Sequence, residues 1–353
     1  MATVTRLLLL CSLLSILIAP VMLSELSNSN YQNEIRHPDE VYRLTGHSDV
    51  VLALSFDDQH HLYSAGRDGK IYVWDLDIPN EKTEFRSFQL LSAADINLQA
   101  SSILCRCTDD WNDIDQLKAD LRVIDLTSGS ETSIPSVDIL SDIALSNSGD
   151  LISGLTLTRW EGAQRIWQVS SGQLIGNYDH DFRFVWSVAF HPSSLLVASG
   201  DEETLTVMEV SSGAIIAEVQ QFYPISNDFS FIKQVVAIDY SADGAQLASL
   251  GDDFSLWIWD TETYSERLHI LSPSDQSTEV SYDRWPVISF SADGRLVVYS
   301  CSEGLCIINS QHGQKLISIP ENATAVAFNT SGTLLALGKE SGEIKIYDLE
   351  SIL

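Results

Sequence analysis

The residues best suited to metal chemistry lie in the acidic segment TDDWNDIDQLKAD, residues 108–120, in which aspartates recur. Carboxylates at alternating positions are the ligands of calcium loops. A loop of the EF-hand type that began at Asp110 would place Ile114 in a ligand position and Asp115 where glycine must turn the chain. The pattern therefore favours a solvated loop, and calcium binding is the weaker alternative.

Motifs for covalent or phosphate chemistry are absent from the sequence. It contains no G-x-S-x-G nucleophile elbow, no H-E-x-x-H zinc motif and no G-x-x-x-x-G-K-[ST] phosphate loop. The eight histidines are scattered along the chain, so they form no evident acid–base cluster. We therefore predict a protein that is not an enzyme, with no catalytic residues, no metal ligands and no cofactor.

The cysteines form two close pairs beyond the N-terminal segment. Cys301 and Cys306 flank the turn residues SEGL and could form a disulfide across a hairpin, with buried free thiols as the alternative. Cys105 and Cys107 would lie on one face of a strand, but no second Cys or His pair follows at zinc spacing. A metal site is therefore not predicted there.

The elements that must position these residues are short strands in a repeat. The stretch RDGKIYVWDL, 67–76, is a tight turn followed by a strand that ends in Trp74-Asp75. Similar strand ends recur, and the polar residues that close them are Asp75, Asp125, Gln168, Glu209, Asp260, Asn309 and Asp348. Their spacings of 50, 43, 41, 51, 49 and 39 residues are typical of four-stranded propeller blades.

This pattern resembles the WD-repeat β-propeller family, with seven degenerate repeats over about residues 40–353. The first repeat carries the resemblance best, from Gly46-His47 through LYSAGRDGKIYVWDL. The resemblance implies an all-β fold, a seven-bladed β-propeller of four-stranded antiparallel blades. It also implies that a leading strand at 40–47 completes the last blade and closes the ring.

The resemblance further implies a hydrogen-bonded structural tetrad in the first blade, made of His47, Ser64, Asp68 and Trp74. In such a set the imidazole bridges the aspartate and the serine, and the serine reaches the indole N–H, so buried polar groups satisfy one another. Later repeats lack the Gly-His pair, and Trp recurs in the terminal pair at Trp167 and Trp259. Tetrads beyond the first blade are therefore not predicted.

The predicted inner strands alternate bulky residues with small ones, and the small phase contains two carboxylates, Asp142 and Asp239. Two carboxylates are too few for a hard cation that takes six or more oxygens. If both pointed at one central site, they would favour an alternative function. That alternative is an extracytoplasmic propeller that binds a small ligand or cation at its central opening, with hydrolytic or redox activity as an option.

The N-terminus differs from the rest of the chain. A basic start precedes the uncharged run 7–23, LLLLCSLLSILIAPVML, and a polar stretch follows it. Residues 1–24 are therefore interpreted as a signal peptide or an N-terminal membrane anchor, and 25–39 as a linker. Either interpretation predicts an extracytoplasmic propeller at 40–353, which is secreted, periplasmic or membrane-tethered. A cytosolic protein is the remaining alternative.

The charge balance also restricts the partners. The chain has 20 Lys and Arg against 49 Asp and Glu, a formal net charge of -29. Affinity for phosphates comes chiefly from clustered cations, so this acidic composition disfavours nucleic acid as a partner. We expect a monomeric propeller that binds protein partners and approaches a membrane only through an uncleaved N-terminal segment.

The longest predicted loops are rich in aromatic residues and arginine, which commonly anchor protein interfaces. They lie around 156–164, 220–233 and 272–286, and the resemblance implies that such loops open on the docking face of the disc. The partner-binding candidates are Trp160, Arg183, Phe184, Phe222, Tyr223, Phe229, Phe231, Tyr282, Arg284 and Trp285. The sequence thus predicts a non-enzymatic protein-interaction scaffold.

Overall fold

The computed structural model describes residues 38–78, 81–108, 119–137, 140–157, 162–179, 185–221, 233–271 and 286–353. These residues belong to one compact unit, Arg36–Leu353. Within the described ranges every regular element is a β-strand, and no helix is present that could cross a bilayer. The prediction of an all-β chain is confirmed.

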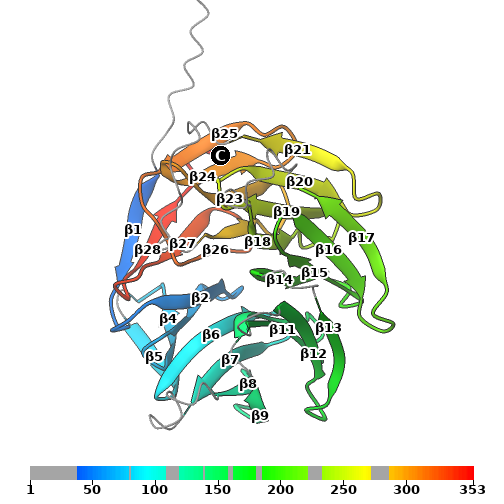
Figure 1. Cartoon of the computed structure of the whole chain (residues 1–353). Helices are drawn as coiled ribbons and strands as arrows, with labels where there is room; N and C mark the ends of the chain where they lie inside the picture. The colour runs from blue at the N-terminus through cyan, green and yellow to red at the C-terminus, as the bar shows by residue number, and fades with distance from the viewer. Residues whose placement is uncertain are drawn as a thin grey trace, which may run out of the picture. The chain divides into compact units, whose positions relative to one another are not determined.

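The strands form seven four-stranded antiparallel sheets, which follow one another around a ring (Figure 1). The first three blades are β2(Val51–Phe56), β3(His61–Gly66), β4(Lys70–Asp75) and β5(Glu81–Ser87); β6(Leu90–Asn97), β7(Ser102–Thr108), β8(Ala119–Asp125) and β9(Glu131–Val137); and β10(Leu140–Leu145), β11(Leu151–Leu157), β12(Gly162–Gln168) and β13(Leu174–Asp179). In each blade the first strand lies near the centre of the ring and the fourth lies at its periphery (Figure 1).

Blades four to six repeat this order. Their strands are β14(Ser187–Phe190), β15(Leu196–Gly200), β16(Thr204–Glu209) and β17(Ile215–Gln220); β18(Val235–Tyr240), β19(Gln246–Gly251), β20(Leu256–Asp260) and β21(Glu266–Ile270); and β22(Ile288–Phe290), β23(Leu296–Cys301), β24(Gly304–Asn309) and β25(Lys315–Ile319). The predicted seven-bladed propeller of four-stranded blades is confirmed.

The seventh blade closes the ring with a strand from the other end of the described chain. It contains β26(Ala325–Phe328), β27(Leu334–Gly338), β28(Ile344–Asp348) and β1(Asp39–Leu44). The leading strand β1 pairs antiparallel with β28, from Asp39 opposite Asp348 to Leu44 opposite Ile344. This closure is the one predicted from the sequence, and it gives every blade a neighbour on both sides.

The SADG turns explain how the sequence separates an inner strand from the next strand. In blade five the Ser241 hydroxyl donates to Asp243 at 2.6 Å and accepts from the Gln246 backbone N–H at 2.9 Å. Gly244 takes a φ of +73°, a conformation that residues with a side chain rarely adopt. Ser291 and Asp293 repeat the same contact in blade six at 2.7 Å. Local side-chain bonds therefore fix the turn.

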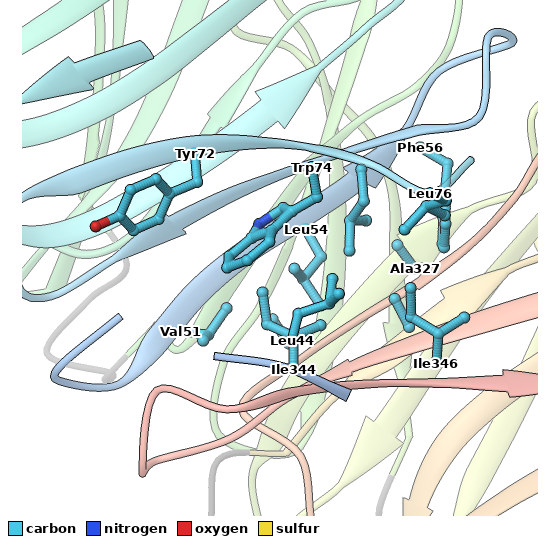
Figure 2. Packing of buried hydrophobic residues seen from close by; sticks show 13 residues of the cluster. Leu44, Val51, Leu54, Phe56, Tyr72, Trp74, Leu76, Ala327, Ile344 and Ile346 are labelled. Atoms are coloured by element: carbon cyan, nitrogen blue, oxygen red, sulfur yellow. The ribbon is translucent and has the colours of Figure 1, made fainter. Parts of the chain in front are cut away.

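The hydrophobic core lies between blades and not within them. Each of the seven clusters of buried residues combines side chains from two adjacent sheets. At the closure, Leu54 and Trp74 of blade one pack with Ile344 and Ile346 of blade seven, and Leu44 joins the same cluster (Figure 2). A single four-stranded sheet exposes two apolar faces, so each blade depends on both of its neighbours.

Candidate functional site

The structure brings the four tetrad residues of blade one together. The two ring nitrogens of His47 lie 2.9 Å from Asp68 Oδ1 and 2.8 Å from Ser64 Oγ. The indole N–H of Trp74 donates to the same Ser64 Oγ at 2.8 Å. These bonds tie the loop before β2 to strands β3 and β4, because His47 precedes β2, Ser64 lies on β3 and Trp74 lies on β4.

Asp68 anchors this network in the turn between β3 and β4. Its carboxylate also accepts the backbone N–H groups of Ser48, at 2.8 Å, and Lys70, at 3.2 Å. Burial raises the pKa of Asp68, but the hydrogen bonds from His47 and the two N–H groups outweigh burial and leave the pKa below its usual value. The carboxylate is therefore ionised at neutral pH and holds the imidazole in place.

The order Asp68, His47, Ser64 matches the order of partners in a hydrolytic triad. A nucleophilic serine must present its Oγ to a substrate. Ser64 is fully buried, and its Oγ is already engaged by the indole N–H of Trp74. This arrangement stabilises the interior and offers no access for a substrate.

Part of the tetrad recurs in blade five. Trp259 Nε1 donates to Ser249 Oγ at 2.8 Å, and both residues are buried. The positions correspond to Trp74 and Ser64 in the repeat. The serine–tryptophan bond therefore persists where the Gly-His pair is missing. The recurrence of Trp in the terminal pair was the sequence signal for this bond.

Three aspartates on inner strands link adjacent blades. Asp95 of β6 accepts the backbone N–H of Leu145, Asp142 of β10 accepts that of Val188, and Asp239 of β18 accepts that of Phe290. The distances are 2.8, 2.9 and 2.8 Å. Each bond crosses from one blade to the inner strand of the next. These carboxylates therefore act as connectors between sheets.

The sequence pattern indicated two carboxylates on the inner strands, Asp142 and Asp239, and gave no signal for Asp95. Asp95 lies on the inner strand of blade two, LLSAADIN, two residues before the strand ends. Burial in the surrounding protein raises the pKa of Asp95 to about 6. Burial likewise raises the pKa of Asp142 and of Asp239 to about 7, and the charge of Asp95 adds to both shifts.

These raised values reduce the charge that the three carboxylates carry near neutral pH. In the described part of the chain, no group of three or more His, Cys, Asp or Glu side chains has an arrangement that could hold a metal ion. Each aspartate already uses one oxygen on a backbone N–H of the next blade. The geometry thus gives these groups a structural use.

The two cysteine pairs differ in their chemistry. Cys301 and Cys306 form a disulfide, with their Cα atoms 5.9 Å apart, so the disulfide is the alternative that the structure supports. Cys105 and Cys107 are buried free thiols on β7, and their Sγ atoms lie 2.8 Å apart. Burial and the neighbouring Cys107 raise the pKa of Cys105 well above its usual value, which keeps this thiol protonated and unreactive.

The predicted partner-binding residues and most of the acidic segment lie outside the described residues. This holds for Trp160, Arg183, Phe184, Phe222, Tyr223, Phe229, Phe231, Tyr282, Arg284 and Trp285, and for residues 109–118. The strands that these segments connect are described. Each segment joins either the fourth strand of one blade to the first strand of the next blade, or the second strand of a blade to its third. Because neighbouring strands are antiparallel, both kinds of connection lie on the same face of the propeller.

A closed ring of seven four-stranded blades defines the chain as a β-propeller. Its segments 38–75, 172–207 and 229–260 match the WD40 family model, described as "WD domain, G-beta repeat". The chain is thus a seven-bladed β-propeller in which three segments match the WD repeat, consistent with the resemblance that its strand ends and first repeat carry.

Two known proteins are similar to part of this chain. Over 223 residues, or 61% of this chain, it is 21% identical to the WD repeat-containing protein 91 homolog of Dictyostelium discoideum. Over 232 residues, or 63% of this chain, it is 19% identical to Protein SPA1-RELATED 4 of Arabidopsis thaliana. The matches cover 27% and 28% of the two relatives, so the chain spans about a quarter of each.

Proposed function

We propose that this chain is a non-enzymatic scaffold that binds protein partners on the propeller face formed by its longer loops. The observation that carries the proposal is the engagement of Ser64 and of the three inner aspartates in structural bonds. Ser64 is buried beneath Trp74, and the inner aspartates are bonded to backbone N–H groups of neighbouring blades. The similarity to WD-repeat proteins supports the same proposal.

The position of the longer loops supports a docking face. Segments 222–232 and 272–285 connect fourth strands to first strands, and 158–161 connects a second strand to a third. Their aromatic and arginine side chains can bury a large area at low entropic cost. We infer that the ten partner-binding candidates contribute to one interaction face.

We further propose that the propeller acts outside the cytoplasm, either secreted, periplasmic or tethered to a membrane. The basic start and apolar run of residues 1–24 support export. The disulfide between Cys301 and Cys306 is compatible with an oxidising compartment. Fractionation of cells that express the full chain, with N-terminal sequencing of the product, tests this proposal. A full-length, cytosolic product would contradict it.

The alternative of ligand binding at the central opening has less support. A cation would have to compete with the backbone N–H groups of Leu145, Val188 and Phe290 for the three inner carboxylates. Bound calcium would stabilise the folded chain by mass action. An increase in melting temperature with calcium, reversed by a chelator, would favour this alternative over the scaffold.

The scaffold is tested by affinity capture with the full chain. We expect a Phe229→Ala and Trp285→Ala double variant to lose captured proteins that the unmodified chain retains, because both anchors are removed. A variant at an exposed residue of the C-terminal turn, Glu350→Ala, serves as the control. Unchanged capture by the double variant would contradict a docking role for these loops.

A further inference from the structure

The outer strand of each blade has one unpaired edge. These strands are β5, β9, β13, β17, β21, β25 and β1, each of which pairs with a neighbour on one side in the strand order. An open edge presents backbone N–H and C=O groups to any additional strand. Natural proteins blunt such edges with charged residues, above all lysine, and with proline, while glycine weakens a strand.

Six of the seven outer strands contain lysine, arginine, proline or glycine. The residues are Lys82 and Arg86 on β5, Pro135 on β9, Gly176 on β13, Arg267 on β21, Lys315 on β25 and Arg43 on β1. The remaining strand, β17, has the sequence IIAEVQ, which contains no lysine, arginine, proline or glycine. With Glu218 as its one charged residue and none of these four residue types, its edge is the least protected of the seven.

The start of β17 is also unusually apolar for a surface strand. Ile215 is 60% exposed and Ile216 is 50% exposed. Leu195, 66% exposed, lies in the preceding turn of the same blade, and its carbonyl accepts the backbone N–H of Val210 at 2.9 Å, beside the turn that leads into β17. Exposed apolar side chains therefore accompany an open backbone edge.

The Asp, Glu, Lys and Arg residues of the described part of blade four are all acidic. The described part of blade four, residues 185–221, contains no lysine or arginine. Its acidic residues are Asp201, Glu202, Glu203, Glu209 and Glu218. Glu218 is exposed on β17 itself. An incoming strand that carries lysine or arginine would therefore meet charge of the opposite sign, and one with β-branched residues would cover the two isoleucines.

A second copy of this chain is a poor occupant of the edge. The described part of blade four contains acidic residues and no lysine or arginine, so two copies of this edge offer each other no opposite charge. The two bodies would also repel each other, because each carries a formal net charge of -29.

We propose that the free edge of β17 adds an extended segment of a partner protein as a fifth strand of blade four, and that this segment alternates basic and β-branched residues. This inference rests on the proposed scaffold function and names a second docking site apart from the loops. The six residues of β17 span about 20 Å, which suits a partner segment of similar length. Backbone hydrogen bonds would provide affinity, and Glu218 and the isoleucines would provide selectivity.

The chain contains a matched control for this site. The residues VSSGAII, 210–216, lead into β17, and VSSGQLI, 169–175, lead into β13 of the neighbouring blade. Ile175 is 45% exposed, similar to Ile216. The variants Ile216→Lys and Ile175→Lys thus add the same charge at equivalent positions, but the first faces an unprotected edge and the second a strand that contains Gly176.

The test uses fluorescence anisotropy with the full chain and a labelled ten-residue peptide of alternating lysine and valine. We expect saturable binding that Ile216→Lys weakens about tenfold more than Ile175→Lys does, because the new lysine repels the incoming lysines. Both variants should melt within about 2 °C of the unmodified chain, since both positions are exposed. Absence of binding, or equal weakening by the two variants, would overturn the proposal.

A second probe tests strand addition without any variant. The same peptide with alternate backbone nitrogens methylated keeps its charge but cannot complete a strand ladder. We expect it to lose binding to the unmodified chain. If it binds as well as the parent peptide, the attraction is general electrostatics and the proposal fails.

The outcomes separate this inference from the scaffold proposal. Loop-dependent capture of partners without peptide binding at β17 would refute the edge site and leave the scaffold intact. Peptide binding at β17 with capture that is unaffected by Phe229→Ala and Trp285→Ala would support the edge site and refute the loop face.

Discussion

At the scale of single residues, Ser64 and Ser249 have the same partner type but different numbers of partners. Ser64 Oγ lies within hydrogen-bond distance of both His47 Nε2 and Trp74 Nε1, whereas Ser249 Oγ accepts from Trp259 Nε1. All these side chains are almost fully buried. A buried polar group that loses its partner retains the full cost of its desolvation.

We therefore predict that Ser64→Ala destabilises the protein more than Ser249→Ala does. The first change leaves two buried polar groups without a partner, at a cost of about 2–4 kcal/mol, and the second leaves one, at about 1–2 kcal/mol. Thermal unfolding followed by circular dichroism measures the difference. His312→Ala, at an exposed turn, serves as the control and should have no effect. Equal losses for the two serine variants would contradict this account of the tetrad.

At the scale of elements, the inner aspartates couple the stability of blade contacts to pH. Their folded pKa values of about 6 to 7 exceed the usual aspartate value of 3.8. The folded chain therefore holds protons that the unfolded chain has released across this interval. Stability from these groups is fully present below the unfolded pKa and is lost as the pH rises through about 6 to 7.

The corresponding prediction concerns Asp142→Asn. Asparagine cannot ionise, and its carbonyl oxygen can accept one of the two backbone N–H groups, those of Ile143 and Val188, that Asp142 accepts. One pKa unit corresponds to about 1.4 kcal/mol, so the variant should lose less stability than the unmodified chain between pH 5 and pH 8. Melting temperatures across this range give the slope. Asp58→Asn, at an exposed turn, should leave the slope unchanged. A slope unaffected by Asp142→Asn would show that this group is not the source.

At the scale of the whole molecule, ring closure joins the beginning of the described chain to its end. Besides the β1–β28 ladder and the cluster around Trp74, a set of charges gathers at this blade. Glu321 accepts hydrogen bonds from Lys345 at 2.8 Å and from the Tyr347 hydroxyl at 2.6 Å, and Glu40 of β1 lies 3.4 Å from Lys345. Burial raises the pKa of Glu321, but these donors and Lys339 outweigh it and hold the pKa at about 2.

We predict that removal of residues 1–44 destabilises the propeller strongly, whereas removal of residues 1–37 does not. The longer deletion removes β1, leaves the edge of β28 unpaired and takes Leu44 from the closure core. A loss of several kcal/mol corresponds to a fall in melting temperature of about 10 °C or more for a chain of this size. Differential scanning calorimetry compares the two truncated chains. Equal melting temperatures would contradict the role of β1 in closure.

The sequence determined the local and repetitive features of this protein. Strand ends such as Trp74-Asp75, turns such as YSADG and the leading strand at 40–47 predicted seven blades and their closure, because each feature depends on backbone preferences and a fixed period. The tetrad residues of the first blade could also be identified from the sequence, because the repeat fixes their spacing along the chain.

Only the tertiary structure determined the contacts between neighbouring blades and the outer edges that the blades leave open. The bond from Asp95 to the N–H of Leu145 spans 50 residues, and no local pattern specifies which backbone group a carboxylate meets across a ring. The unprotected edge of β17 likewise emerged when all seven outer strands could be compared in place. The physical reason is that a blade buries its faces and places its polar groups against other blades, so those contacts exist only in the closed ring.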